Sequence, residues 1–153
     1  MEIFMRLLGI TSYNGSNYQG WQKQPNGNSI EEEIERVLSQ YFNREINIIG
    51  AGRTDAGVHA LRQYFHFDVD VDSIDIDKLL YSINMMLSRD IKIVDFEQVD
   101  DDFHARFSAK EKHYGYTISL SQKEVFFYDT LYVCPFKLDI KLMQNALTHF
   151  IGK

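Results

Sequence analysis

Residues 50–70, "GAGRTDAGVHALRQYFHFDVD", decide the fold of this chain. Three glycines fall within the first eight residues, and apolar and polar residues then alternate. A dinucleotide-binding loop requires a helix after its glycines, because the helix N-terminus receives the pyrophosphate. A period of two predicts a half-buried strand instead, which excludes a Rossmann-type cofactor site. One strand face carries Leu61, Phe65, Phe67 and Val69, and the other carries Arg62, Tyr64, His66 and Asp68.

The residues before this stretch predict a strand, a loop, a helix and a short strand. Residues 2–12 are apolar on both strand faces, and residues 13–28 are rich in glycine and asparagine. In "SIEEEIERVLSQYF", Ser29 and Glu32 form a capping box at the start of a helix. The predicted buried face of that helix comprises Ile30, Ile34, Val37, Leu38 and Tyr41. The segment "EINIIGAG" predicts the short strand.

The residues after this stretch complete a first domain. "DIDKLLYSINMML" has apolar residues at helical spacing, and "IKIVDFEQV" predicts another strand. The order β-α-β-β-α-β over residues 1–100 is the ferredoxin-like pattern, an α+β fold with an antiparallel sheet. We therefore predict a ferredoxin-like domain over residues 1–102.

Residues 103–153 predict the incomplete start of a second, similar domain. Strands are expected at residues 112–120 and 130–134, and a helix at residues 139–153. A unit of this size cannot bury much of its own sheet face. We therefore expect a chain cut within a domain, or one that a partner completes.

Composition limits the classes of function. No apolar run approaches the ~20 residues of a membrane-spanning helix, and a single cysteine, Cys134, excludes an internal disulfide. Both features fit a cytoplasmic protein. The histidines are scattered over predicted strands, so no metal site is expected. The net charge of −6 argues weakly against a nucleic-acid partner without excluding a local basic patch.

Arg53 and Asp55 stand two residues apart in the glycine-rich loop. One interpretation is a simple turn, because glycine and aspartate are common turn residues. A tight hairpin needs fewer residues than "GAGRTDAG", however, and extended backbone points Arg53 and Asp55 to the same side. A loop between two strands that presents both side chains is also a reasonable catalytic arrangement.

Three motifs together resemble the tRNA pseudouridine synthase I family. They are "GAGRTDAGVHA" at residues 50–60, "YNGSNYQGWQKQPN" at residues 13–26 and "FHARFSAKEKHYGYTI" at residues 103–118. They lie in the order of the family, and the resemblance covers the whole chain. Departures are Asn14 in place of the usual Asp, Ser16 in place of Thr and Glu31 in place of Gln. A family member continues beyond "LTHFIGK", so we expect this chain to be a fragment.

The resemblance implies an isomerase that converts uridine to pseudouridine in the anticodon stem-loop of tRNA. It makes Asp55 the catalytic nucleophile, in agreement with the ability of a carboxylate to attack and then leave. Attack on the uracil ring, attack on the ribose and proton abstraction all remain open. The reaction requires no cofactor and no metal. The family works as a homodimer with RNA across both subunits.

The resemblance also implies the RNA contacts. The target uridine must be extruded from its stack, and Tyr114 matches the tyrosine that stacks on the flipped uracil. Arg53 is expected to contact phosphate or to fill the vacated stack. The second domain, residues 103–153, is expected to bind RNA and to take part in catalysis. An RNA-binding turn is expected at its start, at Phe103, His104, Ala105, Arg106 and Phe107, extended by Lys110 and Lys112. Structural roles remain possible: a surface ion pair for Arg53 and a core position for Tyr114.

Other aromatic residues are expected to be structural. Tyr116 is expected in the core, and Tyr18 and Trp21 are expected to anchor the N-terminal loop on the sheet. A non-catalytic RNA-binding module of the RRM type remains the alternative function, because such domains also place aromatic residues on a sheet. An acid in the RNA groove would repel phosphate, which argues against a pure binder.

Overall fold

The computed structural model describes residues 4–25, 27–121 and 123–152. The chain forms two compact units, Met1–Lys112 and His113–Lys153. Some predicted positions lie outside the described residues: the start of the strand at residues 2–12, Asn26 in the following loop, and Lys153 at the end of the last helix.

The first unit is built on a four-stranded antiparallel sheet in the order β2-β3-β1-β4. Its strands are β1 (Met5–Tyr13), β2 (Ile49–Gly50), β3 (Ala60–Val69) and β4 (Ile91–Val99). The central strand β1 pairs with β3 on one side and β4 on the other. The four predicted strands are therefore present, although β2 is shorter than "EINIIGAG" suggested.

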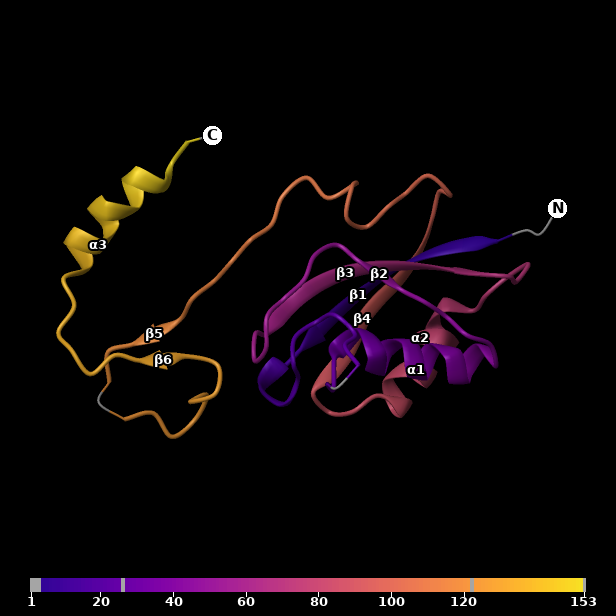
Figure 1. Ribbon diagram of the computed structural model, residues 1–153, viewed down its shortest axis with the longest axis horizontal. Helices are drawn as coiled ribbons and strands as arrows, with labels where there is room; N and C mark the ends of the chain where they lie inside the picture. Colours follow the sequence, from indigo (N-terminus) through magenta and orange to yellow (C-terminus); the bar gives the residue numbers. More distant parts are fainter. Residues whose placement is uncertain (1–3, 26, 122, 153) are drawn as a thin grey trace. The chain divides into compact units, whose positions relative to one another are not determined.

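Two helices, α1 (Ile30–Phe42) and α2 (Ile76–Met86), cover one face of this sheet, the lower face in Figure 1. Each begins at a side chain that accepts a backbone N–H: Ser29 from Glu32 and Asp75 from Lys78. The buried face of α1 comprises Ile30, Ile34, Val37 and Leu38, together with Glu35. The helix predictions and the Ser29 cap are confirmed, and the α+β class is confirmed.

A β-bulge changes which side chains of β3 face the helices. Thr11 pairs with Gln63, but Tyr13 pairs with Ala60, so two residues of β3 lie opposite one residue of β1. Phe65, Phe67 and Val69 face the core as predicted. Leu61 is 88% exposed, so its predicted place on the buried face is wrong. The extra residue breaks the alternation at that point.

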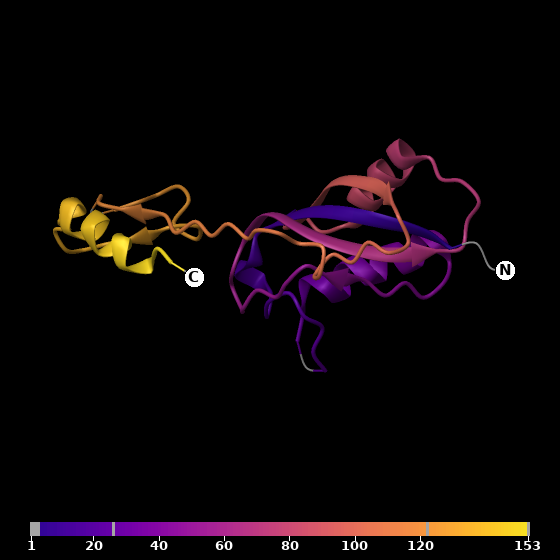
Figure 2. The same cartoon turned by 90° about the horizontal axis from the view of Figure 1, so that it is seen from above.

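The opposite face of the sheet is covered by the chain that follows β4. The Ala105 N–H donates to His66 Nδ1 at 3.1 Å, and the Arg6 guanidinium donates to the Phe103 carbonyl at 2.9 Å. In Figures 1 and 2 this segment runs over the strands on the side away from the helices. His66 is consequently 3% exposed, although the sequence placed it on the polar face.

The second unit contains β5 (Ile118–Ser119), β6 (Tyr132–Val133) and α3 (Ile140–Leu147). The two strands are parallel, and both are shorter than the predicted strands at residues 112–120 and 130–134. The alternation before Ile118 does not produce a longer strand, because β6 offers only two residues for pairing. A 3₁₀ turn, η2 (Thr148–Phe150), follows α3 within the predicted helix.

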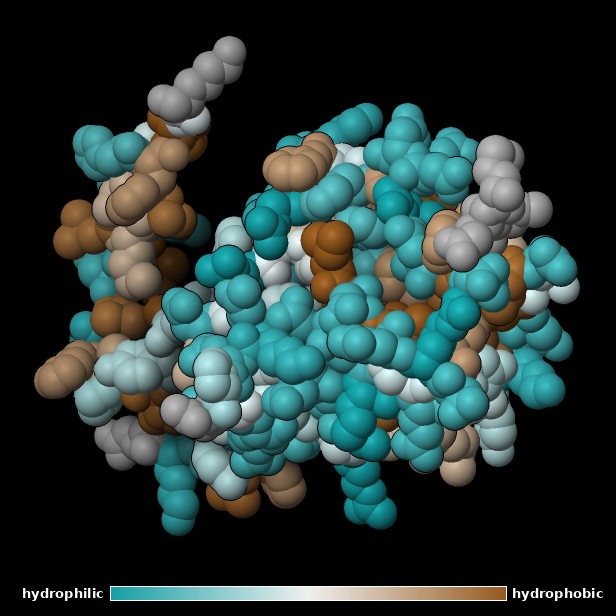
Figure 3. Space-filling view, turned by 45° about the vertical axis from the view of Figure 1, so that its right-hand side comes forward, coloured by the Kyte–Doolittle hydropathy of each residue, from teal (hydrophilic) through white to brown (hydrophobic). Residues whose placement is uncertain are grey.

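Many apolar side chains of the second unit are exposed. Hydrophobic side chains are more frequent on this unit than on the visible face of the first unit in Figure 3. On and after α3 the exposed set includes Ile140, Leu142, Met143, Leu147, Phe150 and Ile151. Within the described residues, no helix is both long enough and apolar enough to cross a membrane.

Candidate functional site

Arg53 and Asp55 lie on the loop between β2 and β3, residues 51–59, which we call the Asp55 loop. Both residues are exposed, whereas Thr54 between them is half-buried. No hydrogen bond or ion pair of either charged side chain occurs among the described residues, so the surface ion pair considered for Arg53 is not formed there. Both charged groups are available to a substrate.

The backbone of the Asp55 loop is held by residues 14–28, which we call the N-terminal loop. The backbone N–H of Trp21 donates to the Thr54 carbonyl at 3.0 Å, and the backbone N–H of Gly57 donates to the Tyr18 carbonyl at 3.1 Å. At the base of the loop, the Gly15 N–H donates to His59 Nδ1 at 3.0 Å. Two motifs far apart in the sequence therefore form one hydrogen-bonded structure.

Two glycines of the N-terminal loop allow this close approach. A Cβ on Gly15 would lie 2.0 Å from the Val58 carbonyl oxygen, and a Cβ on Gly20 would lie 2.4 Å from the Thr54 carbonyl oxygen. Gly20 also has a φ of +90°, which residues with a Cβ rarely adopt. Gly15 and Gly20, which helped to predict a loop from the sequence, are therefore packing positions.

Trp21 and Tyr18 anchor the N-terminal loop, as predicted. Trp21 is 2% exposed and Tyr18 is 6% exposed. The Trp21 ring lies between the rings of Tyr13 and Phe65, with centroid distances of 6.0 and 6.4 Å. These aromatic residues belong to the core and are not available for base stacking.

Two of the residues that depart from the family pattern form side-chain hydrogen bonds. The Asn14 side chain accepts the Ser16 N–H at 3.0 Å, which an aspartate could equally accept. The Glu31 carboxylate accepts the Lys23 N–H at 2.8 Å, and burial raises the pKa of Glu31. These residues therefore support the shape of the N-terminal loop.

The predicted RNA-binding turn lies within residues 103–108, which we call the FHARFS turn. The Ala105 side chain is 2% exposed and packs against the sheet, while Phe103 and His104 are half-buried. Arg106 is exposed and Phe107 is 80% exposed. Of the five predicted residues, Arg106 and Phe107 thus have side chains that a partner can reach readily.

Two imidazoles hold the FHARFS turn in place. His66 Nδ1 accepts the Ala105 N–H, and His104 Nδ1 accepts the Arg106 N–H at 3.2 Å. The centroids of the His66 and His104 rings are 4.8 Å apart. Burial and, secondarily, the Arg6 guanidinium lower the pKa of His66, which favours the neutral imidazole that can accept a hydrogen bond.

The chain after this turn reaches the Asp55 loop. A Cβ on Gly52 would lie 2.9 Å from the Lys112 ammonium nitrogen, so the end of the Lys112 side chain covers Gly52. Gly52 in turn accepts a hydrogen bond from the Gln63 amide at 2.7 Å. The third motif therefore brings a cation next to the loop that carries Asp55.

Tyr114 and Tyr116 belong to the second unit. Tyr114 is 87% exposed, so the core role considered for it is not seen in that unit. Tyr116 is 79% exposed, and its predicted core position is wrong, because residues 113–117 form no strand. Tyr114 and Asp55 lie in different units.

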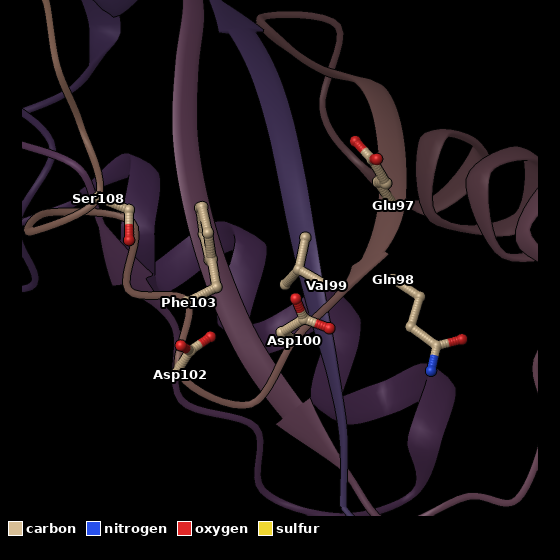
Figure 4. Close-up of a pocket in the computed structure, with 7 residues that line it drawn as sticks. All are labelled: Glu97, Gln98, Val99, Asp100, Asp102, Phe103 and Ser108. Atoms are coloured by element: carbon tan, nitrogen blue, oxygen red, sulfur yellow. The ribbon is translucent and has the colours of Figure 1, made fainter.

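A shallow pocket of about 380 Å³ lies on the first unit. Its lining residues come from the segment between Glu97 and Ser108 and include none of the Asp55 loop. Figure 4 shows the carboxylates of Glu97, Asp100 and Asp102 around it, with Phe103 between them and Ser108. These carboxylates would repel a phosphate backbone. The pocket is therefore unsuited to an RNA substrate. Within the described ranges, no three His, Cys, Asp or Glu side chains form a group that could hold a metal ion.

Sequence reasoning missed Tyr13, Thr54 and His66 as residues that shape the site. The Tyr13 hydroxyl and Thr54 Oγ1 form a hydrogen bond of 2.9 Å. The available signal was the position of both residues inside two of the three motifs.

Comparison with known proteins identifies sequence relatives of this chain. A family model described as "tRNA pseudouridine synthase" matches residues 10–108. The tRNA pseudouridine synthase A of Thermodesulfovibrio yellowstonii is 43% identical over 141 residues, which are 92% of this chain and 55% of the relative. That of Acetivibrio thermocellus is 42% identical over 144 residues, 94% of this chain and 59% of the relative.

A third relative, the tRNA pseudouridine synthase A of an Exiguobacterium species, is 40% identical over 147 residues. The matched residues make up 96% of this chain and 59% of the relative. The chain thus spans between 55% and 59% of the length of these relatives. On the basis of the match to residues 10–108, which include the Asp55 loop and the FHARFS turn, the chain belongs to the tRNA pseudouridine synthase family.

Proposed function

We propose that the full-length protein converts uridine to pseudouridine in the anticodon stem-loop of tRNA, with Asp55 as the nucleophile. The reaction breaks the N1–C1′ bond and joins C5 to C1′, while a proton leaves C5 and N1 gains one. A carboxylate can form the transient covalent bond and then leave. The observation that carries the proposal is the exposed Asp55 carboxylate, which has no partner among the described residues, on a loop held by neighbouring segments.

The RNA contacts proposed for the first unit are cationic and aromatic. Arg53 stands beside Asp55, and Arg106 and Phe107 are exposed on the FHARFS turn. Arginine side chains suit phosphate contacts, which position the nucleic acid without reading its sequence. We assign Tyr114 to stacking on the flipped uracil, supported by its 87% exposure and by the family resemblance.

We also propose a ferredoxin-like domain over residues 1–102 and the start of a second domain of the same kind over residues 103–153. The first assignment is supported by the order β1-α1-β2-β3-α2-β4 and by the sheet order β2-β3-β1-β4. The family resemblance supports a homodimer and a cytoplasmic location. Light scattering of the full-length protein would test the dimer.

The test of the function is release of tritium from C5-labelled uridine in tRNA by the full-length protein. Asp55→Asn should abolish release, since an amide cannot act as the nucleophile. Asp72→Asn is the matched control, because Asp72 is also exposed and has no hydrogen bond or ion pair among the described residues.

Two outcomes would contradict the proposal in different ways. Release by Asp55→Asn at the wild-type rate would show that Asp55 is not the nucleophile. A full-length protein that binds tRNA but releases no tritium would instead support the RNA-binding module.

Residues 1–153 alone are expected to release no tritium from C5-labelled tRNA. The family resemblance implies that the part beyond "LTHFIGK" supplies a basic partner to the catalytic aspartate. No cationic group pairs with the Asp55 carboxylate within the residues that the structure describes. The same tritium assay on this segment checks the expectation, with the full-length protein as the positive control. A normal turnover by a monomer of this segment would overturn it.

A further inference from the structure

Thr54, the residue before Asp55, is held from two directions. Its Oγ1 forms a hydrogen bond with the Tyr13 hydroxyl at 2.9 Å, and its carbonyl oxygen accepts the Trp21 N–H at 3.0 Å. The bond from Trp21 fixes the position of the Thr54 peptide group. The bond to Tyr13 fixes the rotation of this segment about its long axis, because the Thr54 side chain must point toward Tyr13.

The rotation of Thr54 determines where its neighbours point. Successive side chains of extended backbone point to opposite sides. The exposure pattern follows this rule: Thr54 is half-buried, and Arg53 and Asp55 are exposed. A Thr54 side chain that left Tyr13 would let the segment turn and would redirect the Asp55 carboxylate.

Tyr13 is a rigid anchor for this bond. It ends β1, which has a pairing partner on both sides, and its residue is 4% exposed. Tyr13 lies on the same face of β1 as Leu7, so its ring points into the core beside Trp21, with its hydroxyl at Thr54. Burial raises the pKa of Tyr13, so the hydroxyl stays protonated at neutral pH and can donate.

We propose that Tyr13 is a positioning residue for the reaction: its hydroxyl holds Thr54 so that Asp55 points to the substrate. This inference rests on the proposed function, since it assigns Asp55 the role of nucleophile. Tyr13 itself contacts no substrate. Its loss should slow the chemical step and leave tRNA binding unchanged, because a small misplacement of a reacting group is costly to the rate.

The chain offers a matched control. The Tyr18 hydroxyl forms the same kind of bond with Ser88 Oγ, at 2.8 Å, and Tyr18 is nearly as buried as Tyr13. Tyr18→Phe removes that hydroxyl and leaves the Tyr18 carbonyl, which binds Gly57, in place. Both Tyr→Phe variants therefore lose one buried hydroxyl pair, and only Tyr13→Phe loses the bond to Thr54.

The experiment compares full-length variants by single-turnover tritium release at saturating tRNA and by tRNA binding. We expect Tyr13→Phe and Thr54→Val each to slow release at least about tenfold with unchanged binding. The double variant should be no slower than either single variant, because both remove the same bond. Thr54→Ser keeps a hydroxyl and should retain the rate, and Tyr18→Phe should resemble the wild type.

Amide hydrogen exchange of the same variants gives a readout independent of activity. Tyr13→Phe should speed exchange in residues 51–57 and in Trp21, and Tyr18→Phe should not. Equal rates and equal exchange for Tyr13→Phe and the wild type would overturn the inference, as would equal losses for Tyr13→Phe and Tyr18→Phe. Asp55→Asn separates the two proposals: if it retains activity, the function assignment fails, while the exchange result still decides the role of Tyr13.

Discussion

Gly20 and Gly57 both adopt left-handed backbone, with φ values of +90° and +77°, but their surroundings differ. A Cβ on Gly20 would lie 2.4 Å from the Thr54 carbonyl oxygen, whereas a Cβ on Gly57 would meet nothing within 4 Å. Gly57→Ala should therefore lower the free energy of unfolding by about 1 kcal/mol, the conformational cost alone. Gly20→Ala adds displacement of the Asp55 loop and should cost more than about 2 kcal/mol.

Urea unfolding of the two variants measures this difference. Ser12→Ala, on the neighbouring strand, serves as a control for a small substitution near the same loops. Equal costs for the two glycine variants would show that the N-terminal loop can move away from Thr54 without loss.

At this scale the sequence predicted side chains whose role depends on local spacing. The Ser29 cap and the anchoring roles of Tyr18 and Trp21 are confirmed. Leu61 and Tyr116 were misplaced, because their burial depends on a bulge and on strand pairing that local spacing does not reveal. The candidate residues Arg53 and Asp55 came from their motif, and their catalytic and binding roles remain predictions.

The elements that carry a strong hydrophobic period were predictable. Both α1 and α2 have a continuous apolar face and a side-chain cap, so local signals agree with tertiary packing. The short strands were predicted poorly: β2 and β5 each contain two residues, fewer than the apolar segments around them. Strand length depends on the partner available, which lies elsewhere in the chain.

The attachment of the FHARFS turn to β3 should depend on pH. His66 is buried as a neutral acceptor of the Ala105 N–H, and burial lowers its pKa below the ordinary value of 6.5. The Arg6 cation and His104 also oppose its protonation, and Asp68 favours it. The stabilising contribution is complete above pH 6.5 and decreases as the pH falls toward the pKa of the folded state.

Thermal unfolding as a function of pH should reveal this loss between pH 6.5 and the folded-state pKa of His66. In His66→Gln the side-chain oxygen can accept the Ala105 N–H and does not titrate, so this part of the pH dependence should disappear. An identical pH profile for His66→Gln and the wild type would argue that His66 does not link the turn to protonation.

For the whole molecule, the two units differ in how well they are packed. In the first unit, α1, α2 and the sheet share one core of fully buried residues such as Leu7, Ile34 and Phe65. In the described part of the second unit, Cys134 is the single buried hydrophobic residue. A core of this size cannot offset the conformational entropy of ordering the chain.

Residues 1–112 alone should consequently unfold cooperatively in urea, whereas residues 113–153 alone should show no cooperative transition. Circular dichroism of the two segments tests both expectations, with residues 1–153 as the reference. A cooperative transition in residues 113–153 would show that this unit stabilises itself despite its exposed apolar side chains.

The sequence could not predict how the three motifs meet. The N-terminal loop reaches the Asp55 loop through Gly15 and Gly20, and Lys112 reaches it across Gly52. Each contact joins residues that are distant in the chain, so it depends on the sheet order and on the packing of both sheet faces. The motifs indicated which residues matter, and the topology determines how they touch.

The bulge on β3 makes the number of residues at positions 61 and 62 more important than their identity. Leu61 and Arg62 together lie opposite Ser12 alone and point into solvent, so many side chains would be tolerated there. A deletion of either residue would shorten the segment between the Asp55 loop and Gln63 by one residue. The loop would then be pulled along the strand by roughly the rise of one residue, ~3.4 Å. Homologues should accordingly vary in composition at these two positions and keep their spacing.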